Sequence, residues 1–321
     1  MKKNLVIQIT RVIAMFMIII CHVVQEFDNK YLKMTGQFFN VGVFIFIFIS
    51  GYLYGTKKIE KPKKWLISRF FRIMIPVYIF MIFIFGLQIF VNRNFELKYV
   101  FIYLFDVQFI FGGVLGAQHL WFLTVIMICY IITLILYRNR EKLLKNFKVI
   151  LLIVFAIAIV LSYINQDLGR TVMYIGLYIS AYVYANINKR NKKSIMLLCL
   201  AIIGLFGIRI ISRKFLDGTV LYNTIIVCFT QILLAYNIYW LINELFKNVK
   251  LNENKILNHL DNISYYIYIT HMMFMTGPIR TMGITSNMFL NSFISIGLAW
   301  IMAIILCRLS NMLYDLFKKE F

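Results

Sequence analysis

Long apolar runs separated by short polar segments occupy most of the chain. A transmembrane helix needs about 20 consecutive apolar residues, because the hydrocarbon core of a bilayer is about 30 Å thick. The run at 99–111 is too short to cross, since about 13 residues rising roughly 1.5 Å each reach only about 20 Å. The other runs predict helices near residues 5–24, 38–56, 73–91, 119–137, 149–164, 170–187, 195–211, 220–242, 262–280 and 289–314.

This pattern predicts an all-α, polytopic membrane protein with about ten transmembrane helices and a short re-entrant or interfacial helix near 99–111. Composition supports the prediction, because 61% of the 321 residues are apolar, against roughly 45–50% in soluble proteins. The spans leave only short loops between them. We therefore expect a single transmembrane domain over residues 1–321, and we exclude a soluble enzyme with one core.

The charge pattern sets the predicted orientation. The chain has 34 Lys and Arg residues against 13 Asp and Glu residues, which gives a net charge of +21. The basic residues lie in short segments between apolar runs, which is typical of membrane loops and not of a nucleic-acid interface. With the N-terminus in the cytoplasm, 24 cations fall inside and nine outside, as the positive-inside rule requires. We therefore expect both termini in the cytoplasm, with the lipid bilayer and not nucleic acid as a partner.

One cation does not fit this loop pattern. Arg11 lies inside the first apolar run, and His22 follows eleven residues later. Eleven residues make about three full turns of a helix, so both side chains share one stripe, about 16 Å apart along the axis. An ionisable residue inside a span indicates a functional site. The alternative is that both side chains extend to the membrane interfaces. Glu26, four residues beyond His22, either orients the imidazole or is a solvated loop residue.

A second candidate site lies in the basic segment before the third apolar run. Arg69 and Arg72 stand at i and i+3 and share a helix face, with Lys64 nearby and Pro76 at the expected start of the next span. Two guanidinium groups side by side suit a phosphate or pyrophosphate. Ordinary positive-inside flanking charge is the alternative, and it accounts for the lysines of this segment. Cysteine spacing predicts neither a disulfide framework nor a metal site.

Five sequence motifs stand out along the chain: RVIAMFMIIICH at 11–22, NVGVFIFIFISGYLYG at 40–55, SRFFRIMIPVY at 68–78, HLWFL at 119–123 and SYYIYITH at 264–271. Nearly end to end and in the same order, they are similar to the signatures of the acyltransferase-3 family of ten-span integral membrane O-acyltransferases. Phe44 departs from this pattern, because many members carry Asp or Pro there.

The resemblance implies a reaction and its donor. Members of the family transfer an acyl group, commonly acetyl, from cytoplasmic acyl-coenzyme A to a hydroxyl of an extracytoplasmic or lipid-linked carbohydrate, and no metal is expected. Arg69, Arg72 and Lys64 would then bind the phosphates of acyl-CoA. Arg11 would pair with a phosphate or polarise the thioester. His22 would act as general base on the acceptor hydroxyl or accept the acyl group transiently.

Three further residues are candidates for the acceptor side. His119 and Trp121 open a predicted span at its outer end, where the alternative is an interfacial His beside a Trp anchor. His271 lies in the middle of a predicted span, so it is a stronger candidate than His259, which the pattern places in a cytoplasmic loop.

Two rival functions stay open from the residues. One is a transporter or flippase for a polar or lipid-linked substrate, and the other is a non-catalytic partner in polysaccharide assembly. Transporters often show inverted repeats and broken helices in matching halves, and neither is visible in the sequence, which favours the enzyme. The composition, rich in Ile, Lys and Asn, indicates a bacterial protein of the inner or plasma membrane. The sequence leaves the oligomeric state, the acyl group and the acceptor open.

Overall fold

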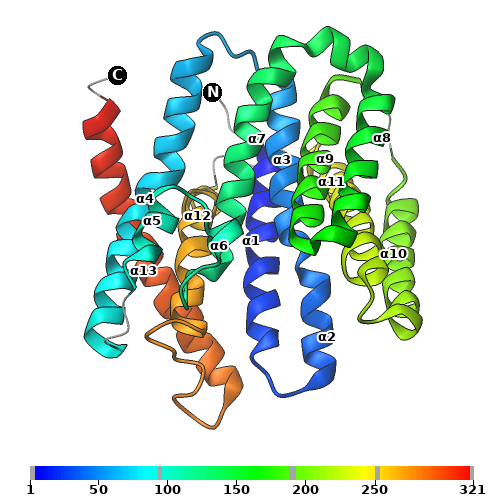
Figure 1. The fold of residues 1–321 in the computed structure, drawn as a ribbon. Coiled ribbons are helices and arrows are strands. Elements are labelled where there is room, and N and C mark those ends of the chain that lie inside the picture. Colours follow the sequence, from blue (N-terminus) through cyan, green and yellow to red (C-terminus); the bar gives the residue numbers. More distant parts are fainter. Residues whose placement is uncertain (1–3, 93–95, 188–192, 250–253, 319–321) are drawn as a thin grey trace. The chain divides into compact units, whose positions relative to one another are not determined.

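The computed structural model describes residues 4–92, 96–187, 193–249 and 254–318. Within these ranges it consists of helices and connecting turns without any β-strand (Figure 1). The predicted all-α class is therefore confirmed. Some basic residues that enter the orientation argument lie outside the described ranges: Lys2, Lys3, Arg93, Lys189, Arg190, Lys192, Lys250 and Lys319.

Eight helical segments of the described chain are long and apolar enough to cross a membrane. They are α1 (Leu5–Gln25), α2 (Lys30–Phe39) joined to α3 (Val41–Thr56), α4 (Pro62–Asn92), η1 (Gln118–Leu120) joined to α7 (Trp121–Arg138), α8 (Arg140–Ile164), α10 (Ile195–Leu216), η2 (Leu221–Ile226) joined to α11 (Val227–Phe246), and α13 (Met288–Lys318). Two more helices, α9 (Gln166–Ile187) and α12 (Lys255–Met275), have the length but are more polar. The protein is a multi-pass membrane protein, and about ten spans is an approximate count.

The segment near 99–111 forms two short helices, α5 (Lys98–Leu104) and α6 (Gln108–Phe111). Neither is long enough to cross a bilayer. Asp106 lies between them with φ 54°, a left-handed conformation that residues other than Gly adopt infrequently. The turn at Asp106 therefore separates the two helices.

Two helices begin earlier than the apolar pattern predicts. Helix α4 begins at Pro62, so Pro76 lies inside the helix and not at its start. Pro62 suits the first position of the helix, because the backbone N–H groups of a first turn have no partner within the helix and proline has no N–H to leave unpaired. Helix α12 begins at Lys255, so the prediction of a loop around His259 is wrong. Hydropathy marks only the lipid-facing part of a helix, and both helices continue into polar sequence.

The third boundary difference is at the end of α10. Arg213 and Lys214 belong to this helix, which ends at Leu216, whereas the apolar pattern ends the predicted helix near residue 211. Only 2% of the Arg209 surface is exposed. The apolar pattern could not predict this, because a buried arginine interrupts hydropathy in the same way as a loop cation does.

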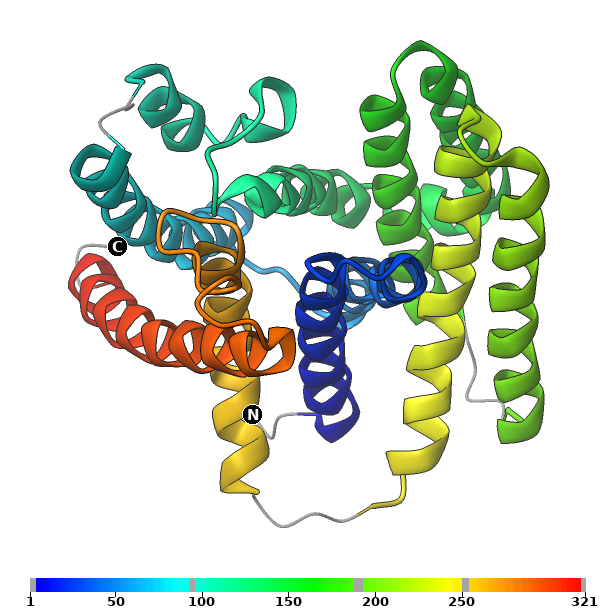
Figure 2. The same cartoon turned by 90° about the horizontal axis from the view of Figure 1, so that it is seen from below.

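The helices group into two compact units. Unit 1 comprises Met1–Ala14, Asn40–Ile59 and Ile132–Asn258, and unit 2 comprises Met15–Phe39, Glu60–Ile131 and His259–Phe321. In unit 1, α9 packs against α3 and α8, and α11 packs against α10 and α3 (Figures 1 and 2).

Two glycines let α3 approach α9 closely in unit 1. A Cβ at Gly51 would overlap the carbonyl oxygen of Tyr178, and one at Gly55 would overlap the carbonyl oxygen of Tyr182. Small residues spaced four apart on a membrane helix allow this backbone approach, because neighbouring helices gain van der Waals contact where no side chain intervenes.

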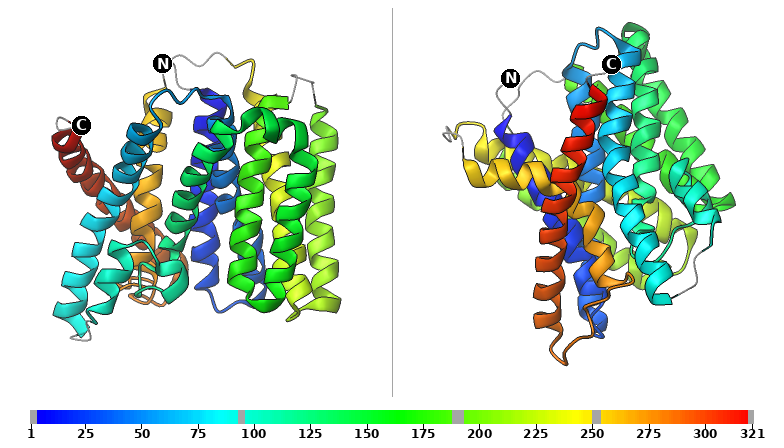
Figure 3. Two further views of the ribbon diagram at one scale, coloured as in Figure 1. Left: turned by 45° about the horizontal axis from the view of Figure 1, so that its top comes forward. Right: turned by 90° about the vertical axis from the view of Figure 1, so that its left-hand side faces the viewer.

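In unit 2, α4 packs against α13 and α5 (Figure 3). Helix α12 is joined to both long helices by hydrogen bonds. The Tyr265 hydroxyl donates to the Ile73 carbonyl of α4 at 2.9 Å, and the Thr270 hydroxyl donates to the Ala299 carbonyl of α13 at 2.9 Å. These bonds set the position of α12, which carries His271.

We predict that Gly51→Ala lowers the thermal unfolding midpoint of the protein in detergent, because the added methyl group overlaps backbone atoms. Overpacking of this kind costs about 1–3 kcal/mol. Gly204→Ala on α10 is the control, since nothing lies within 4 Å of a Cβ there, and Ala is favoured over Gly in a helix by roughly 0.5–1 kcal/mol. Equal midpoints for the two variants would contradict the close approach of α3 and α9.

Candidate active site

Three imidazole rings lie together in unit 2. His22 is on α1, His119 is in η1 and His271 is on α12. The ring centroid of His271 is 5.2 Å from that of His22 and 4.7 Å from that of His119. His271 is 0% exposed and His119 6%, whereas His22 is half-buried. The structure therefore brings one histidine predicted for catalysis next to two predicted for the acceptor.

One backbone carbonyl contacts two of these rings. The carbonyl oxygen of Tyr268 is 2.7 Å from Nε2 of His119 and 2.7 Å from Nδ1 of His271. A carbonyl can only accept, so both of these nitrogens carry a proton, and in each neutral ring the other nitrogen is an acceptor. These acceptors, Nδ1 of His119 and Nε2 of His271, are buried and have no hydrogen-bond partner within the described part of the chain.

The helical spacing of α12 explains half of this arrangement. His271 follows Tyr268 by three residues, and helical side chains point back toward the N-terminus. Its Nδ1 therefore reaches the Tyr268 carbonyl and also lies 3.2 Å from the Ile267 carbonyl. The Tyr268 hydroxyl in turn donates to the backbone carbonyl of His119. Tyr268 thus holds His119 through two groups, across 149 residues of sequence.

The loop before η1 approaches the end of α12 through a glycine. Gly116 has φ +83°, and a Cβ there would lie 2.7 Å from the Cα of Gly277. Only glycine adopts this backbone conformation without strain. Tyr103 of α5 fixes the same loop, because its hydroxyl donates to the Ala117 carbonyl at 3.0 Å and accepts from the Val114 N–H at 3.2 Å. The two contacts set the position of η1.

A buried polar cluster joins α6 to the start of α7. The side-chain amide of Gln108 donates to Asp106 Oδ1 at 2.8 Å and to the Leu120 carbonyl at 3.1 Å, and the Thr124 hydroxyl donates to the Asp106 carbonyl at 2.8 Å. Asp106 is 8% exposed and lies outside the spanning helices. Burial raises the pKa of its carboxyl to about 7, against hydrogen bonds from Thr124 and Gln108 that lower it.

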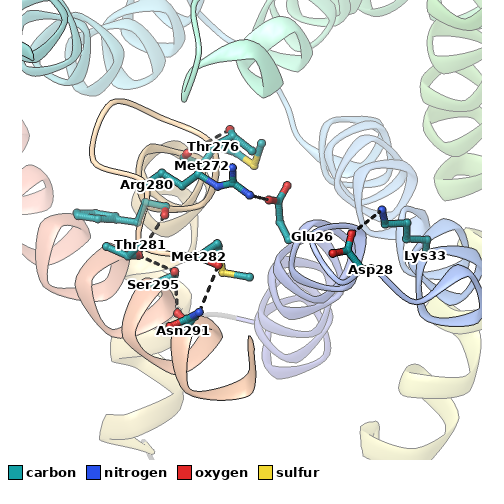
Figure 4. A network of polar contacts seen from close by, with 11 residues as sticks. Glu26, Asp28, Lys33, Met272, Thr276, Arg280, Thr281, Met282, Asn291 and Ser295 are labelled. Carbon is teal, nitrogen blue, oxygen red and sulfur yellow. Dashed lines mark hydrogen bonds and ion pairs between the residues drawn. The ribbon is translucent and has the colours of Figure 1, made fainter. Parts of the chain in front are cut away.

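The loop between α12 and α13 is fixed by buried polar side chains of α13 (Figure 4). Ser295 contacts the hydroxyl of Thr281 at 2.6 Å, and the amide of Asn291 donates to the Met282 carbonyl at 3.3 Å and to the Thr285 carbonyl at 2.8 Å. Asn291 and Ser295 are both 0% exposed. The loop is therefore an ordered part of unit 2.

Glu26 lies just beyond the end of α1 and contacts this loop. Its carboxylate is 3.0 Å from a guanidinium nitrogen of Arg280 (Figure 4). The side chain of Arg280 is 58% exposed, so the ion pair contributes little to stability, about 0.2–1 kcal/mol. The structure gives Glu26 a partner that the sequence did not predict, and its predicted role in orienting His22 stays a prediction.

The predicted phosphate-binding residues lie in the N-terminal part of α4. Arg69 is half-buried, while Arg72 and Lys64 are exposed. The Nε of Arg72 donates to the Tyr314 hydroxyl of α13 at 3.2 Å, and its guanidinium lies 5.0 Å from the centre of that ring. The Ser68 hydroxyl contacts the same phenol oxygen at 3.0 Å. Tyr314 therefore fixes the direction of one of the two predicted arginines.

The two remaining predicted residues are half-buried. Arg11 lies on the same continuous helix as His22, in the part of α1 that belongs to unit 1. Trp121 is the first residue of α7, directly after η1, and its ring meets that of Phe122 edge-on. The continuity of α1 satisfies the expectation that Arg11 and His22 share a helix.

Some residues of the site were missed by sequence reasoning: Tyr103, Asp106, Gln108, Tyr268, Arg280 and Tyr314. Asp106 had a detectable signal, because it is a lone acidic residue in an apolar stretch, the kind of residue that indicates a special role. The tyrosines had none, since aromatic residues are common in membrane helices for packing and as interface anchors.

The arrangement supplies neutral bases in an apolar surrounding, which is suited to proton transfer. Within the described residues, no group of three or more His, Cys, Asp or Glu side chains has a geometry that could hold a metal ion. The fold and site thus define a multi-pass helical membrane protein with a buried cluster of imidazoles.

Comparison with known families adds the chemistry. A family model described as an acyltransferase domain matches residues 4–310, a range that covers most of both units and includes His22, His119 and His271. The chain belongs to the acyltransferase-3 family, and it is a membrane acyltransferase. No significant match was found among curated proteins or among solved structures.

We predict that Asp106→Asn stabilises the protein at neutral and higher pH. Because the folded pKa of about 7 lies above the ordinary 3.8, the protonated carboxyl is favoured by folding, and its contribution is lost as pH rises from about 4 to about 7. The loss is at most about 4 kcal/mol, at roughly 1.4 kcal/mol per pKa unit. Thermal midpoints of wild type and variant should diverge over this range, with the variant higher at about pH 8.

The control for this pH series is Asp28→Asn, at a fully exposed carboxylate whose distance to Lys33 is 3.8 Å. Its midpoint should follow that of the wild type at every pH. A constant difference between Asp106→Asn and wild type across the series would show that folding does not raise the pKa of the Asp106 carboxyl, contrary to the prediction.

Proposed function

We propose that the protein is an O-acyltransferase that moves an acyl group, specifically acetyl, from acyl-coenzyme A to a hydroxyl of an extracytoplasmic or lipid-linked carbohydrate. Family membership supports acyl transfer. The observation that carries the rest is the placement of the half-buried His22 against the buried His271 at 5.2 Å, because a neutral imidazole held by a neighbouring group can take the proton of a hydroxyl.

In the proposed reaction, His22 removes the proton of the acceptor hydroxyl while the hydroxyl oxygen attacks the carbonyl carbon of the thioester. The C–S bond breaks, and the proton passes from His22 to the departing sulfur, so coenzyme A leaves as the thiol. The acceptor gains an ester, and His22 returns to its neutral form. This cycle needs one group that accepts and then donates a proton, which is the ordinary chemistry of imidazole.

The donor side of the proposal rests on Arg69, Arg72 and Lys64. Guanidinium groups bind phosphates through two parallel hydrogen bonds. Arg72 bonds to Tyr314 through Nε, and in this proposal the phosphate binds at the terminal nitrogens of the same guanidinium. For Arg11 we propose that it pairs with a phosphate of the donor or polarises its thioester.

The proposed location is a bacterial inner or plasma membrane, with both termini in the cytoplasm. The distribution of basic residues supports this orientation, because the α4 segment with Lys64, Arg69 and Arg72 then faces the cytoplasmic pool of acyl-coenzyme A. His119 and Trp121 would contact the acceptor carbohydrate, and the buried His271 would lie next to His22.

We predict that His22→Ala abolishes coenzyme A release by the purified protein, because the general base is lost. The assay supplies acetyl-coenzyme A with glucose and with N-acetylglucosamine oligosaccharides as acceptor probes. General-base catalysis contributes about 10²–10⁴-fold, so the loss should be at least of that size. His259→Ala is the matched control at an exposed histidine and should keep full turnover.

If the His22→Ala variant retained turnover, His22 would not be the general base. Absence of thioester turnover in the wild type with every acceptor, together with movement of a glycolipid across vesicles, would replace the enzyme by the rival transporter.

We predict that the double variant Arg69→Ala with Arg72→Ala raises the KM for acetyl-coenzyme A by about tenfold or more and changes kcat less. A hydrogen bond to a charged group is worth about 1.5–3 kcal/mol, and both substrate and transition state would lose it equally. Arg138→Ala with Arg140→Ala removes the same charge at two exposed positions and should leave KM unchanged. Equal KM values for the two double variants would show that Arg69 and Arg72 do not bind the donor.

A further inference from the structure

We infer that His271 is a positioning residue that fixes the ring tautomer of His22 by accepting a hydrogen bond from its N–H. This inference rests on the proposed function of His22 as general base. It concerns a group that does not itself touch the reacting atoms, because His271 is 0% exposed and its Nε2 is fully covered.

The first step is the protonation pattern of His271. Its Nδ1 lies 2.7 Å from the Tyr268 carbonyl and 3.2 Å from the Ile267 carbonyl. With two carbonyl oxygens at Nδ1, the proton of the neutral ring belongs there, and Nε2 carries a lone pair. His271 therefore presents an acceptor, and only an acceptor, to its other neighbours.

The second step is the identity of the donor. Three ring side chains contact His271: His22, His119 and Tyr268. The Tyr268 hydroxyl donates to the His119 carbonyl, and the N–H of His119 contacts the Tyr268 carbonyl. The second nitrogen of His119 is an acceptor, so it cannot donate to Nε2. Of these three rings, His22 is the one whose N–H is available to His271.

The third step is distance. A ring nitrogen lies about 1.2 Å from the imidazole centroid, so an N–H···N bond of about 3 Å between two rings separates the centroids by about 5 Å. The observed separation is 5.2 Å, with the ring planes inclined by 41°. The Cβ–Cγ torsion of an imidazole is soft, so a rotation of the His22 ring would suffice to direct its N–H toward its neighbour.

The consequence is a defined base. Once one nitrogen of His22 donates to His271, the other must carry the lone pair that receives the hydroxyl proton, which is the orienting role that a third group has in catalytic triads. A carboxylate could also perform this role, but inside the protein it would be a buried charge. A neutral imidazole does so without that desolvation penalty, which suits a site inside a membrane protein.

The test replaces His271 by Asn or by Gln, because each amide side chain can reproduce the hydrogen bond of one of the two ring nitrogens. His271→Asn retains an N–H donor at the δ position, toward the Tyr268 carbonyl, but lacks any atom at the ε position. His271→Gln places an amide oxygen at the ε position, where it can accept from His22. We expect His271→Asn to lower kcat for acetyl-coenzyme A by about 10²-fold, and His271→Gln to retain at least about ten times more activity than His271→Asn, with KM for the donor unchanged in both.

A purely structural role predicts the reverse order. In that case Asn, which keeps the bond to Tyr268, would match or exceed Gln in kcat as well as in thermal midpoint, and the inference would be overturned. The result for His22→Ala is independent: its failure to abolish turnover would remove the base itself, whatever the order of the amides.

A second measurement needs neither substrate nor a folded variant. In wild-type protein labelled with ¹⁵N-histidine, a hydrogen bond between His22 and His271 gives a nitrogen–nitrogen coupling across the bond, and we expect to detect it. A His22 ring whose two nitrogens exchange their proton, with no coupling to His271, would contradict the inference.

Discussion

The carbonyl oxygen of Tyr268 accepts hydrogen bonds from His119 of η1 and from His271 of α12. Both imidazoles are buried, and a buried polar group without a partner is costly in a low-dielectric surrounding. Sharing one carbonyl satisfies one nitrogen of each ring and fixes the two rings in opposite tautomers. The acceptor nitrogens that remain give the cluster its chemical character, and the arrangement of His22 against His271 follows from them.

Several parts of unit 2 serve to hold these two rings at that carbonyl. Gly116 and Tyr103 position the loop that leads into η1, and Gln108 joins α6 to the Leu120 carbonyl at the start of α7. On α12, hydrogen bonds from Tyr265 and Thr270 connect the helix to α4 and α13. The short helices near 99–111 therefore have a function in the fold: they support His119, which lies in η1 at the start of the segment that continues into α7.

The spans could be predicted from the sequence because hydropathy follows directly from contact with lipid, and the shared helix of Arg11 and His22 follows from their spacing alone. The proximity of His119 to His271 could not be predicted. It depends on the backbone carbonyl of Tyr268, which is 149 residues from His119, and a backbone carbonyl does not affect the pattern of side chains in the sequence. The predicted helix ends were wrong where a helix continues into polar sequence, as at His259 and Arg213. Asp106 was missed although a lone acid in an apolar run is a visible signal.

The most direct measurement of the central claim is the protonation of individual ring nitrogens by ¹⁵N NMR of histidine-labelled protein, with signals assigned by single substitutions. The account predicts two neutral rings in opposite tautomers, with the proton on Nε2 in His119 and on Nδ1 in His271. Finding both rings in the same tautomer, or either ring doubly protonated at neutral pH, would contradict it.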